Sequence, residues 1–258
     1  MFNTLGALSR GLACLALCCS VFGCASLSSS EQGERTDPLE PLNRAVFDIN
    51  IRLDDALIRP LAEAYRTFLP QWLRDRFRAF IDNLAEPRIL ANDLLQRRPD
   101  AAGKTFARFF INTIVGLGGM FDLATDQGFP KQSGDFGQTL YTLGVGDGPY
   151  VVLLFFGPSN VRDTVGLGVD LYTTPPALIT SGDTGNAIQL AVGAVDGIDL
   201  RSRNIETLDE IKASSLDFYA HLRSIMRQRR AAQLREAGGG KEEPQELFDP
   251  GATPVAPR

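Results

Sequence analysis

The chain has 258 residues, of which 44% are hydrophobic and 22% are charged, and this balance is ordinary for a globular protein with a sizeable core. The formal net charge of -5 at pH 7 is mildly acidic, so the overall composition does not indicate nucleic-acid binding. We therefore expect one folded domain and no nucleic-acid partner.

The N-terminal segment differs from the rest of the chain. Residues 1–24 carry one positive charge, at Arg10, and no acidic residue, and the stretch from Gly11 to Phe22 is apolar. A short apolar stretch behind a positive charge is typical of an export signal. We therefore predict that the chain is exported from the cytoplasm.

The end of this segment, Val21-Phe22-Gly23-Cys24, resembles a bacterial lipobox, in which a small residue precedes a cysteine that is lipidated. Phe22 departs from the small or medium residue that is usual there, and the alternative is an ordinary secretory signal cut near Ala25. Because alanine rather than aspartate follows the cysteine, the pattern resembles that of lipoproteins sent to the outer membrane. We predict a signal peptide over residues 1–23 and lipidation of Cys24.

The cysteines and the single histidine restrict the chemistry. All four cysteines lie at or before the predicted cleavage point, so the mature chain keeps Cys24 alone and has no disulfide, thiolate metal site or other cysteine nucleophile. His221 lies in a predicted C-terminal helix among charged residues, where a solvated surface histidine is favoured over a general base. We also find no G-x-S-x-G motif. The sequence therefore predicts no catalytic residue, no metal and no cofactor.

The segments outside the core have the composition of linkers. The run from Ser26 to Pro38 is polar and rich in serine, which is typical of a flexible tether. From Ala237 onward the chain is rich in glycine and proline and has no apolar periodicity, which is typical of disorder. We expect a tether over residues 24–36, a helical domain over 37–236 and a disordered tail over 237–258.

Within that domain the apolar residues repeat at helical spacing, and we find little that indicates strands. Three such runs are Leu73, Phe77, Phe80, Ile81 and Leu84; Phe106, Phe109, Phe110, Thr113, Ile114 and Leu117; and Leu208, Ile211, Phe218, Leu222 and Ile225. The first run has basic flanks and Trp72 at its start, so it suits a helix lying in a membrane interface as well as one packed on a core. Polar residues are expected to bound the helices: Asp37 and Asn43 to fix the first one, and Glu86-Pro87 to end another.

The apolar, glycine-rich stretch from Phe109 to Thr125 has three candidate interpretations. Its apolar part is about sixteen residues long and is interrupted by polar side chains, whereas a membrane span needs about 20 apolar residues. A dinucleotide-binding loop would need glycine at position 121, where Phe121 stands. The glycines at 116, 118 and 119 instead predict a helix end with close backbone approach, either where helices pack in lipid or in a soluble core.

A second glycine-rich segment extends from Asp135 to Asp163. Its glycines at 144, 146 and 148 together with Pro149 indicate turns, and Gly157-Pro158-Ser159 is a further turn signal. The apolar run from Tyr150 to Phe156 is too short to span a bilayer but long enough to enter one leaflet.

The chain resembles the MlaA/VacJ family of outer-membrane lipoproteins, which help maintain lipid asymmetry by removing phospholipid from the outer leaflet. Ordered blocks over roughly 190 residues carry the resemblance: DPLEPLNRAVFDIN (37–50), RP (59–60), FIDNLAEP (80–87), NDLLQ (92–96), RFFINTIVGLGGMFD (108–122), DFGQTL, GVGDGPY, GPSNVRD, DGIDLRSRN (196–204) and SLDFY (215–219). Leu154 stands where this family often has proline, which leaves the geometry of that loop open.

The resemblance implies a mainly α fold, a ring of helices lying in one membrane leaflet around an amphipathic channel. It further implies phospholipid as the cargo, a soluble periplasmic carrier resembling MlaC as the recipient, trimeric porins as neighbours, and attachment at the periplasmic side of the outer membrane. Two alternatives stay open: a lipid-anchored scaffold without a lipid path, and a phospholipid-hydrolysing enzyme. On the leading interpretation the candidate residues of the lipid path are Asn112, Gly116, Gly118, Gly119, Asp122, Gly148, Pro149 and Tyr150. For Asn112 and Asp122, packing and helix capping are the competing roles.

Overall fold

The computed structural model describes residues 37–174 and 183–239. The predicted signal peptide, Cys24, the tether and nearly all of the predicted tail lie outside these residues. The part that is described belongs to a single compact unit that begins at Asp37. It is mostly helical and contains one small sheet, which confirms the mainly α fold predicted from the helical spacing.

The helices and strands follow one another in this order. A continuous helical stretch comprises α2 (Glu40–Leu53), the π-helical turn η1 (Asp54–Ile58) and α3 (Arg59–Phe68). The next helices are α4 (Gln71–Leu95), α5 (Pro99–Ile114), α6 (Leu123–Asp126) and α7 (Phe136–Thr142). The strands β1 (Tyr150–Leu153) and β2 (Gly157–Asn160) precede α8 (Val161–Thr173), α10 (Asp183–Arg203), α11 (Ile205–Ser214) and α12 (Phe218–Ala237).

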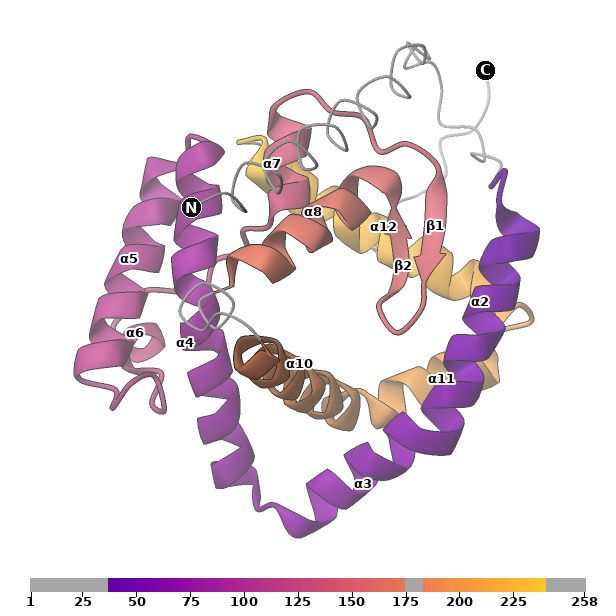
Figure 1. The fold of residues 1–258 in the computed structure, drawn as a ribbon, viewed down its shortest axis with the longest axis horizontal. Helices are drawn as coiled ribbons and strands as arrows, with labels where there is room; N and C mark the ends of the chain where they lie inside the picture. Colours follow the sequence, from indigo (N-terminus) through magenta and orange to yellow (C-terminus); the bar gives the residue numbers. More distant parts are fainter. Residues whose placement is uncertain (1–36, 175–182, 240–258) are drawn as a thin grey trace, which may run out of the picture. The chain divides into compact units, whose positions relative to one another are not determined.

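Contacts between these elements close into a circuit (Figure 1). Starting from α2, each element touches the next in the order β1, β2, α8, α7, α4, α10, α3 and η1, and η1 returns to α2. The hairpin turn between β1 and β2 is directed toward the middle of this circuit (Figure 1). Within the described unit, the arrangement is consistent with the helical ring that the family resemblance implies.

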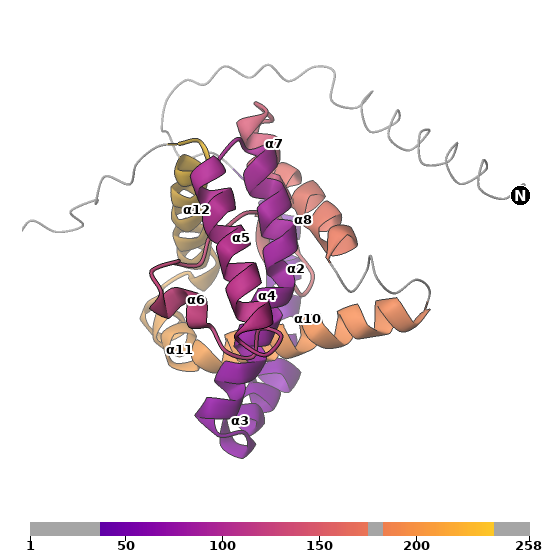
Figure 2. The ribbon, with the colours of Figure 1, turned by 90° about the vertical axis from the view of Figure 1, so that its left-hand side faces the viewer.

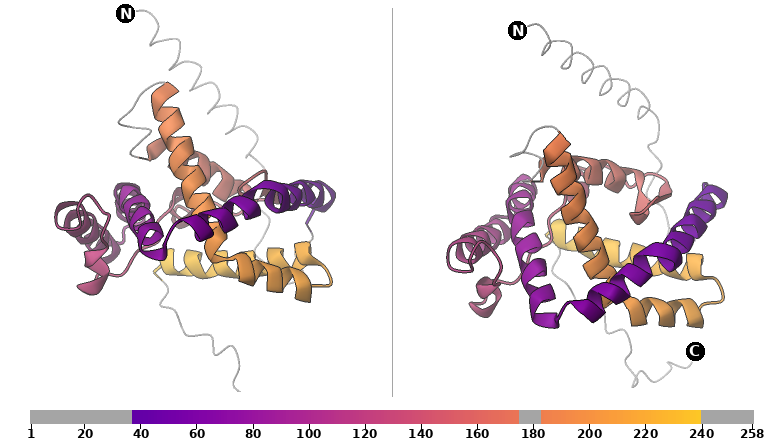
Figure 3. Two further views of the ribbon diagram at one scale, coloured as in Figure 1. Left: turned by 90° about the horizontal axis from the view of Figure 1, so that it is seen from below. Right: turned by 60° about the horizontal axis from the view of Figure 1, so that its bottom comes forward.

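Two further pairings support the circuit. Helices α4 and α5 lie side by side (Figure 2). Helices α11 and α12 contact each other, and since α11 also touches α10 and α12 also touches α7, the pair links two distant parts of the circuit (Figure 3).

Two local predictions from the sequence were wrong. Glu86-Pro87 does not end a helix, because α4 continues through Pro87 for two more turns. Gly157-Pro158-Ser159 is not a turn but forms most of β2, and the turn lies one step earlier, at 154–156, where Leu154 takes the place of the family's usual proline. The antiparallel register pairs Tyr150 with Asn160 and Leu153 with Gly157.

Burial in the described residues runs opposite to the pattern of a water-soluble protein. The largest fully buried side chains there are polar or charged: Arg108, Gln138, Glu86, Asn112, Thr105, Thr139, Asp93, Asp199 and Ser202. Large apolar side chains are exposed instead. On α5, Phe106, Phe110 and Ile114 are each more than half exposed, and their spacing of four places them on one stripe.

A small apolar core accompanies this polar interior. It consists of Phe47, Val152 and Tyr219, which come from α2, β1 and α12. The rings of Phe47 and Tyr219 meet edge to face with centroids 5.5 Å apart, a favoured geometry for aromatic pairs. This cluster fixes the hairpin between the first and the last described helices.

Candidate functional site

The two polar candidates on the Phe109–Thr125 stretch belong to a cluster around Arg108. Arg108 is 1% exposed and donates to Glu86 of α4 at 2.8 Å and to Asp122 at 3.1 Å. Asn112 is 2% exposed; its Nδ2 donates to Asp122 at 3.0 Å, and its Oδ1 accepts from the backbone N–H of Ala124 at 3.0 Å. Both candidate side chains are therefore engaged in bonds that join α4, α5 and α6.

The electrostatics of this cluster follow from its burial. Burial raises the pKa of Glu86 above its ordinary value, and the hydrogen bond and charge of Arg108 offset this only in part. At Asp122 burial also acts to raise the pKa, but hydrogen bonds from Thr125, Asn112 and Arg108 outweigh it and hold the pKa below its ordinary value. Asp122 also caps α6, since it accepts from the backbone N–H of Thr125 at 3.3 Å.

The glycines after α5 form the tight turn that ends this helix. A Cβ at Gly116 would lie 2.3 Å from the carbonyl oxygen of Phe121, and one at Gly119 would lie 2.3 Å from Cβ of Asn83 on α4. Gly118 has open space around it, but its φ of +72° strongly favours glycine. Gly116 and Gly119 therefore permit close approach, whereas Gly118 supplies backbone conformation. Their place in a lipid path stays a prediction.

Gly148, Pro149 and Tyr150 lie at the base of the hairpin, away from its turn. Gly148 has a φ of +67° and packs on Val161, and the carbonyl of Pro149 accepts from the N–H of Val161 at 3.2 Å. The ring of Tyr150 packs edge to face against Tyr219, and burial raises the pKa of Tyr150 to about 12. These three residues thus anchor the hairpin, and their role in a lipid path is likewise a prediction.

Two asparagines on α2 hold the free edge of β1. Asn43 donates to the carbonyl of Tyr150 at 3.1 Å and accepts from the N–H of Val152 at 2.9 Å. Asn50 repeats this pattern one step along, donating to the carbonyl of Leu153 at 2.9 Å and accepting from the N–H of Phe155 at 3.0 Å. An amide side chain can donate and accept as a peptide does, so the two residues act as a substitute for a neighbouring strand.

The π-helical turn η1 brings charged groups to the same region. Pro60 lacks an N–H and its ring crowds the carbonyl four residues earlier, and a wider turn directly before it accommodates this. Asp54 of this turn pairs with Arg201 of α10 through two contacts of 2.8 and 2.9 Å. Asp55 pairs with Lys212 of α11 at 3.0 Å.

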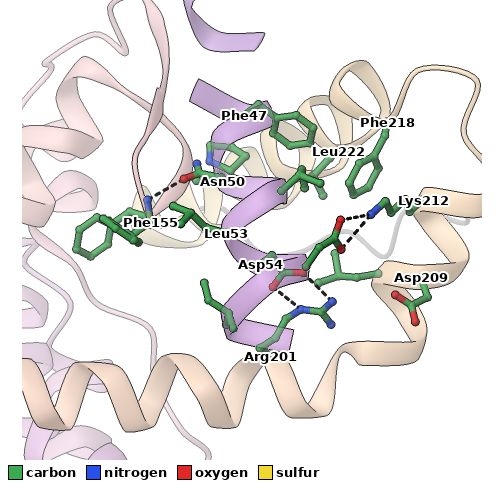
Figure 4. Close-up of a pocket in the computed structure, with 17 residues that line it drawn as sticks. Phe47, Asn50, Leu53, Asp54, Phe155, Arg201, Asp209, Lys212, Phe218 and Leu222 are labelled. Atoms are coloured by element: carbon green, nitrogen blue, oxygen red, sulfur yellow. Dashed lines mark hydrogen bonds and ion pairs between the residues drawn. The ribbon is translucent and has the colours of Figure 1, made fainter. Parts of the chain in front are cut away.

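These elements line a partly open pocket of about 200 Å³ between α2, η1, the hairpin turn, α10, α11 and α12 (Figure 4). One wall is charged and consists of Asp54, Asp55, Arg201, Asp209 and Lys212. The remaining wall is largely apolar and includes Phe47, Ile51, Leu53, Ile58, Phe155, Phe156, Leu208, Phe218 and Leu222. The pocket is therefore amphipathic, and it can receive a molecule that has a charged end and an apolar body.

None of the residues predicted for the lipid path lines this pocket. The sequence prediction came nearest at the apolar run from Tyr150 to Phe156, whose last two residues line it. The charged wall was missed because its members are separated by up to 158 residues, from Asp54 to Lys212, and meet only through the fold. The sequence signal that was available concerns the hairpin edge and not the charged wall: Asn43 and Asn50 are seven residues apart, which places two amides on one helix face.

The described residues give no indication of a metal site or a membrane span. Within 37–174 and 183–239, no three His, Cys, Asp or Glu side chains are grouped so that they could hold a metal ion. In the same residues, every helix is too short or too polar to cross a bilayer.

Comparison with known proteins shows the family. Residues 35–233 match the family model described as MlaA lipoprotein. The chain is 36% identical over 231 residues to the "Intermembrane phospholipid transport system lipoprotein MlaA" of Escherichia coli K12, with 87% of each chain covered. It is 31% identical over 201 residues to the protein of the same name from Haemophilus influenzae, covering 76% of this chain and 80% of that one. The chain belongs to the MlaA lipoprotein family.

A solved structure agrees with this assignment. The protein described under "Structural basis for maintenance of bacterial outer membrane lipid asymmetry" superposes with a TM-score of 0.67 at 33% identity. The match covers 78% of this chain and 100% of the other. The family predicted from the sequence blocks is thus confirmed by sequence and by fold.

Proposed function

We propose that this protein is an outer-membrane component of a phospholipid transport system that maintains lipid asymmetry. It removes phospholipid from the outer leaflet and passes it to a soluble periplasmic carrier resembling MlaC. The names of the relatives support the transport role, since those from Escherichia coli and Haemophilus influenzae are intermembrane phospholipid transport lipoproteins.

The observation that carries the proposal is the inverted burial of the described residues. Arg108, Glu86 and Asn112 are buried in bonded polar clusters, while Phe106, Phe110 and Ile114 form an exposed apolar stripe. Soluble monomers rarely expose contiguous apolar surface of this kind, whereas a protein embedded in lipid gains from doing so. The proposed placement is within one leaflet, as the family resemblance implies, and the exposed apolar stripe of α5 supports contact with lipid there.

The attachment and the neighbours belong to the same proposal. Cys24 carries the lipid anchor on the periplasmic side of the outer membrane, and the protein associates with trimeric porins there. The predicted lipobox and the family support the anchor. We propose no catalytic step, because moving a phospholipid from a leaflet to a carrier breaks no bond. The lipid needs only a polar route for its head group and an apolar surface for its chains.

Photo-cross-linking in native membranes tests this function. A photoreactive residue at Phe155 or Phe156, in the hairpin turn, should form phospholipid adducts, and one at Gln228, on the exposed side of α12, serves as the control. Adducts with protein alone at both turn positions would support a scaffold instead. Release of fatty acid or lysolipid by the purified protein would support the hydrolase.

A further inference from the structure

The charged wall of the pocket presents both signs in alternation. Asp54 and Asp55 project from η1, and each faces a cation, Arg201 from α10 and Lys212 from α11 (Figure 4). Asp209 of α11 adds a third carboxylate to the wall, and it pairs at 2.8 Å with Arg59 of α3, which does not itself line the pocket. The lining thus holds three carboxylates and two cations, and Arg59 behind it balances the third carboxylate, so the wall has no net positive charge that would attract an anion.

The charged groups of this wall are already paired with one another or with Arg59, so a ligand that shares or displaces these contacts must offer a partner to both signs. A phosphate alone would pair with Arg201 and Lys212 but would bring its negative charge close to three carboxylates. A group that joins a phosphate to an ammonium has a partner for each sign. Lys212 is the favoured phosphate contact because its ammonium is partly exposed, whereas Nε and Nη2 of the nearly buried Arg201 already donate to Asp54.

The size of the pocket restricts how much of the ligand it holds. A cavity of about 200 Å³ is smaller than the roughly 300–1,000 Å³ of sites that enclose drug-sized ligands, so it fits a head group and not two acyl chains. The apolar wall continues to Phe155 and Phe156, which are more than half exposed. The chains of a lipid can therefore lie along the hairpin turn while the head group is inside.

We propose that this pocket binds the zwitterionic, amine-bearing head group of a phospholipid and selects it over anionic head groups. The phosphate contacts Arg201 and Lys212, and the ammonium contacts the carboxylates of Asp54, Asp55 and Asp209. This inference rests on the proposed function, which supplies phospholipid as the cargo, and it adds the class of phospholipid and the groups that recognise it.

Lipid capture by the purified full-length protein tests the proposal. The protein is stripped of lipid in detergent, incubated with vesicles of equimolar phosphatidylethanolamine and phosphatidylglycerol, recovered, and its bound lipid quantified by mass spectrometry. The wild type should retain phosphatidylethanolamine in about fivefold excess, the upper end expected for partly exposed charge pairs.

A pair of neighbouring variants assigns the selection to the pocket. Asp209→Lys gives the lining two carboxylates and three cations, and it should bring the ratio to about one or below. Glu206→Lys makes the same charge change on α11 and likewise breaks an ion pair with an arginine of α3, since Glu206 pairs with Arg66 as Asp209 pairs with Arg59. Glu206 is exposed and does not line the pocket, so this variant should keep the wild-type ratio. Circular dichroism checks that both variants fold.

The outcomes separate this proposal from the proposed function. Equal retention of the two lipids by the wild type overturns head-group selection but leaves phospholipid binding intact. The same ratio in both variants shows that the selecting groups lie elsewhere, which also overturns it. If the wild type retains no phospholipid at all, the proposed function fails together with this inference.

Discussion

The amides of Asn43 and Asn50 hold the hairpin edge, and their removal gives a graded prediction. Asn43→Ala deletes the partners of the Tyr150 carbonyl and of the Val152 N–H, and Val152 is only 6% exposed. It also removes a donor to the carboxylate of Asp37, which keeps its bond from Tyr219. A buried polar group left without a partner costs about 1–3 kcal/mol, so the two groups together should cost about 2–6 kcal/mol.

Asn50→Ala should cost less. It frees the N–H of Phe155, which lies in an exposed setting where water can replace the lost bond. A replaced hydrogen bond is worth only about 0.5–1.5 kcal/mol, so the predicted order of destabilisation is Asn43→Ala, then Asn50→Ala, then the control Gln228→Ala, whose hydrogen bond is on the surface of α12.

Two measurements check this order. The thermal midpoint of the detergent-solubilised protein reports the global effect, and hydrogen exchange followed by mass spectrometry reports the amides of Val152 and Phe155 separately. Each variant should accelerate exchange first at the amide that its own side chain held. If Asn43→Ala has the same thermal midpoint as Gln228→Ala and the Val152 amide stays protected from hydrogen exchange, the edge-holding role is refuted.

Three further predictions concern the glycine turn, the buried ion pair and the anchor. Gly119→Ala should lower the melting temperature, because the φ of Gly119 is +95° and a Cβ there would lie 2.3 Å from a side-chain atom of α4. The control Gly103→Ala, which has open space around it in α5, should leave the melting temperature equal or raise it. The reverse order would exclude close packing at Gly119. Arg108→Met leaves the carboxylate of Glu86 buried without its partner and should cost about 3–5 kcal/mol of stability. Adding Glu86→Gln in the same chain should recover part of this loss. A double variant that melts no higher than Arg108→Met alone argues against the pair. Cys24→Ala should abolish metabolic labelling with fatty acid, and label that persists contradicts the anchor.

The predictable part of the fold was its local part. Runs such as Leu73 to Leu84 and Phe106 to Ile114 predicted α4 and α5 because a helix repeats its face every 3.6 residues. The same logic failed at Pro87, because the cost of proline inside a helix was outweighed by the tertiary contacts of α4, among them the buried pair of Glu86 with Arg108. Short strands were missed because four-residue strands carry little periodicity.

The candidate site was less predictable for a physical reason. Asn112 and Asp122 were chosen as polar residues bracketing an apolar run, and this choice cannot distinguish a residue that faces a channel from one that satisfies another buried group. The structure places both in bonds around Arg108. A bulky substitution such as Asn112→Trp therefore overpacks a buried position and reports on folding first, whereas substitutions in the hairpin turn, at Phe155 or Phe156, act on an open wall.

The polar interior and the apolar exterior have a common consequence for transport. In the buried network, Arg108 contacts Glu86 and Asp122 through bonds of specific geometry. These bonds stabilise the fold in lipid, where burying apolar side chains gains little because the surrounding lipid is itself apolar. Such a bonded frame can offer a route by shape and charge alone. On the proposed function, lipid then moves down its own gradient through the frame, and the work that gives transport a direction must be supplied by a partner that removes lipid on the periplasmic side.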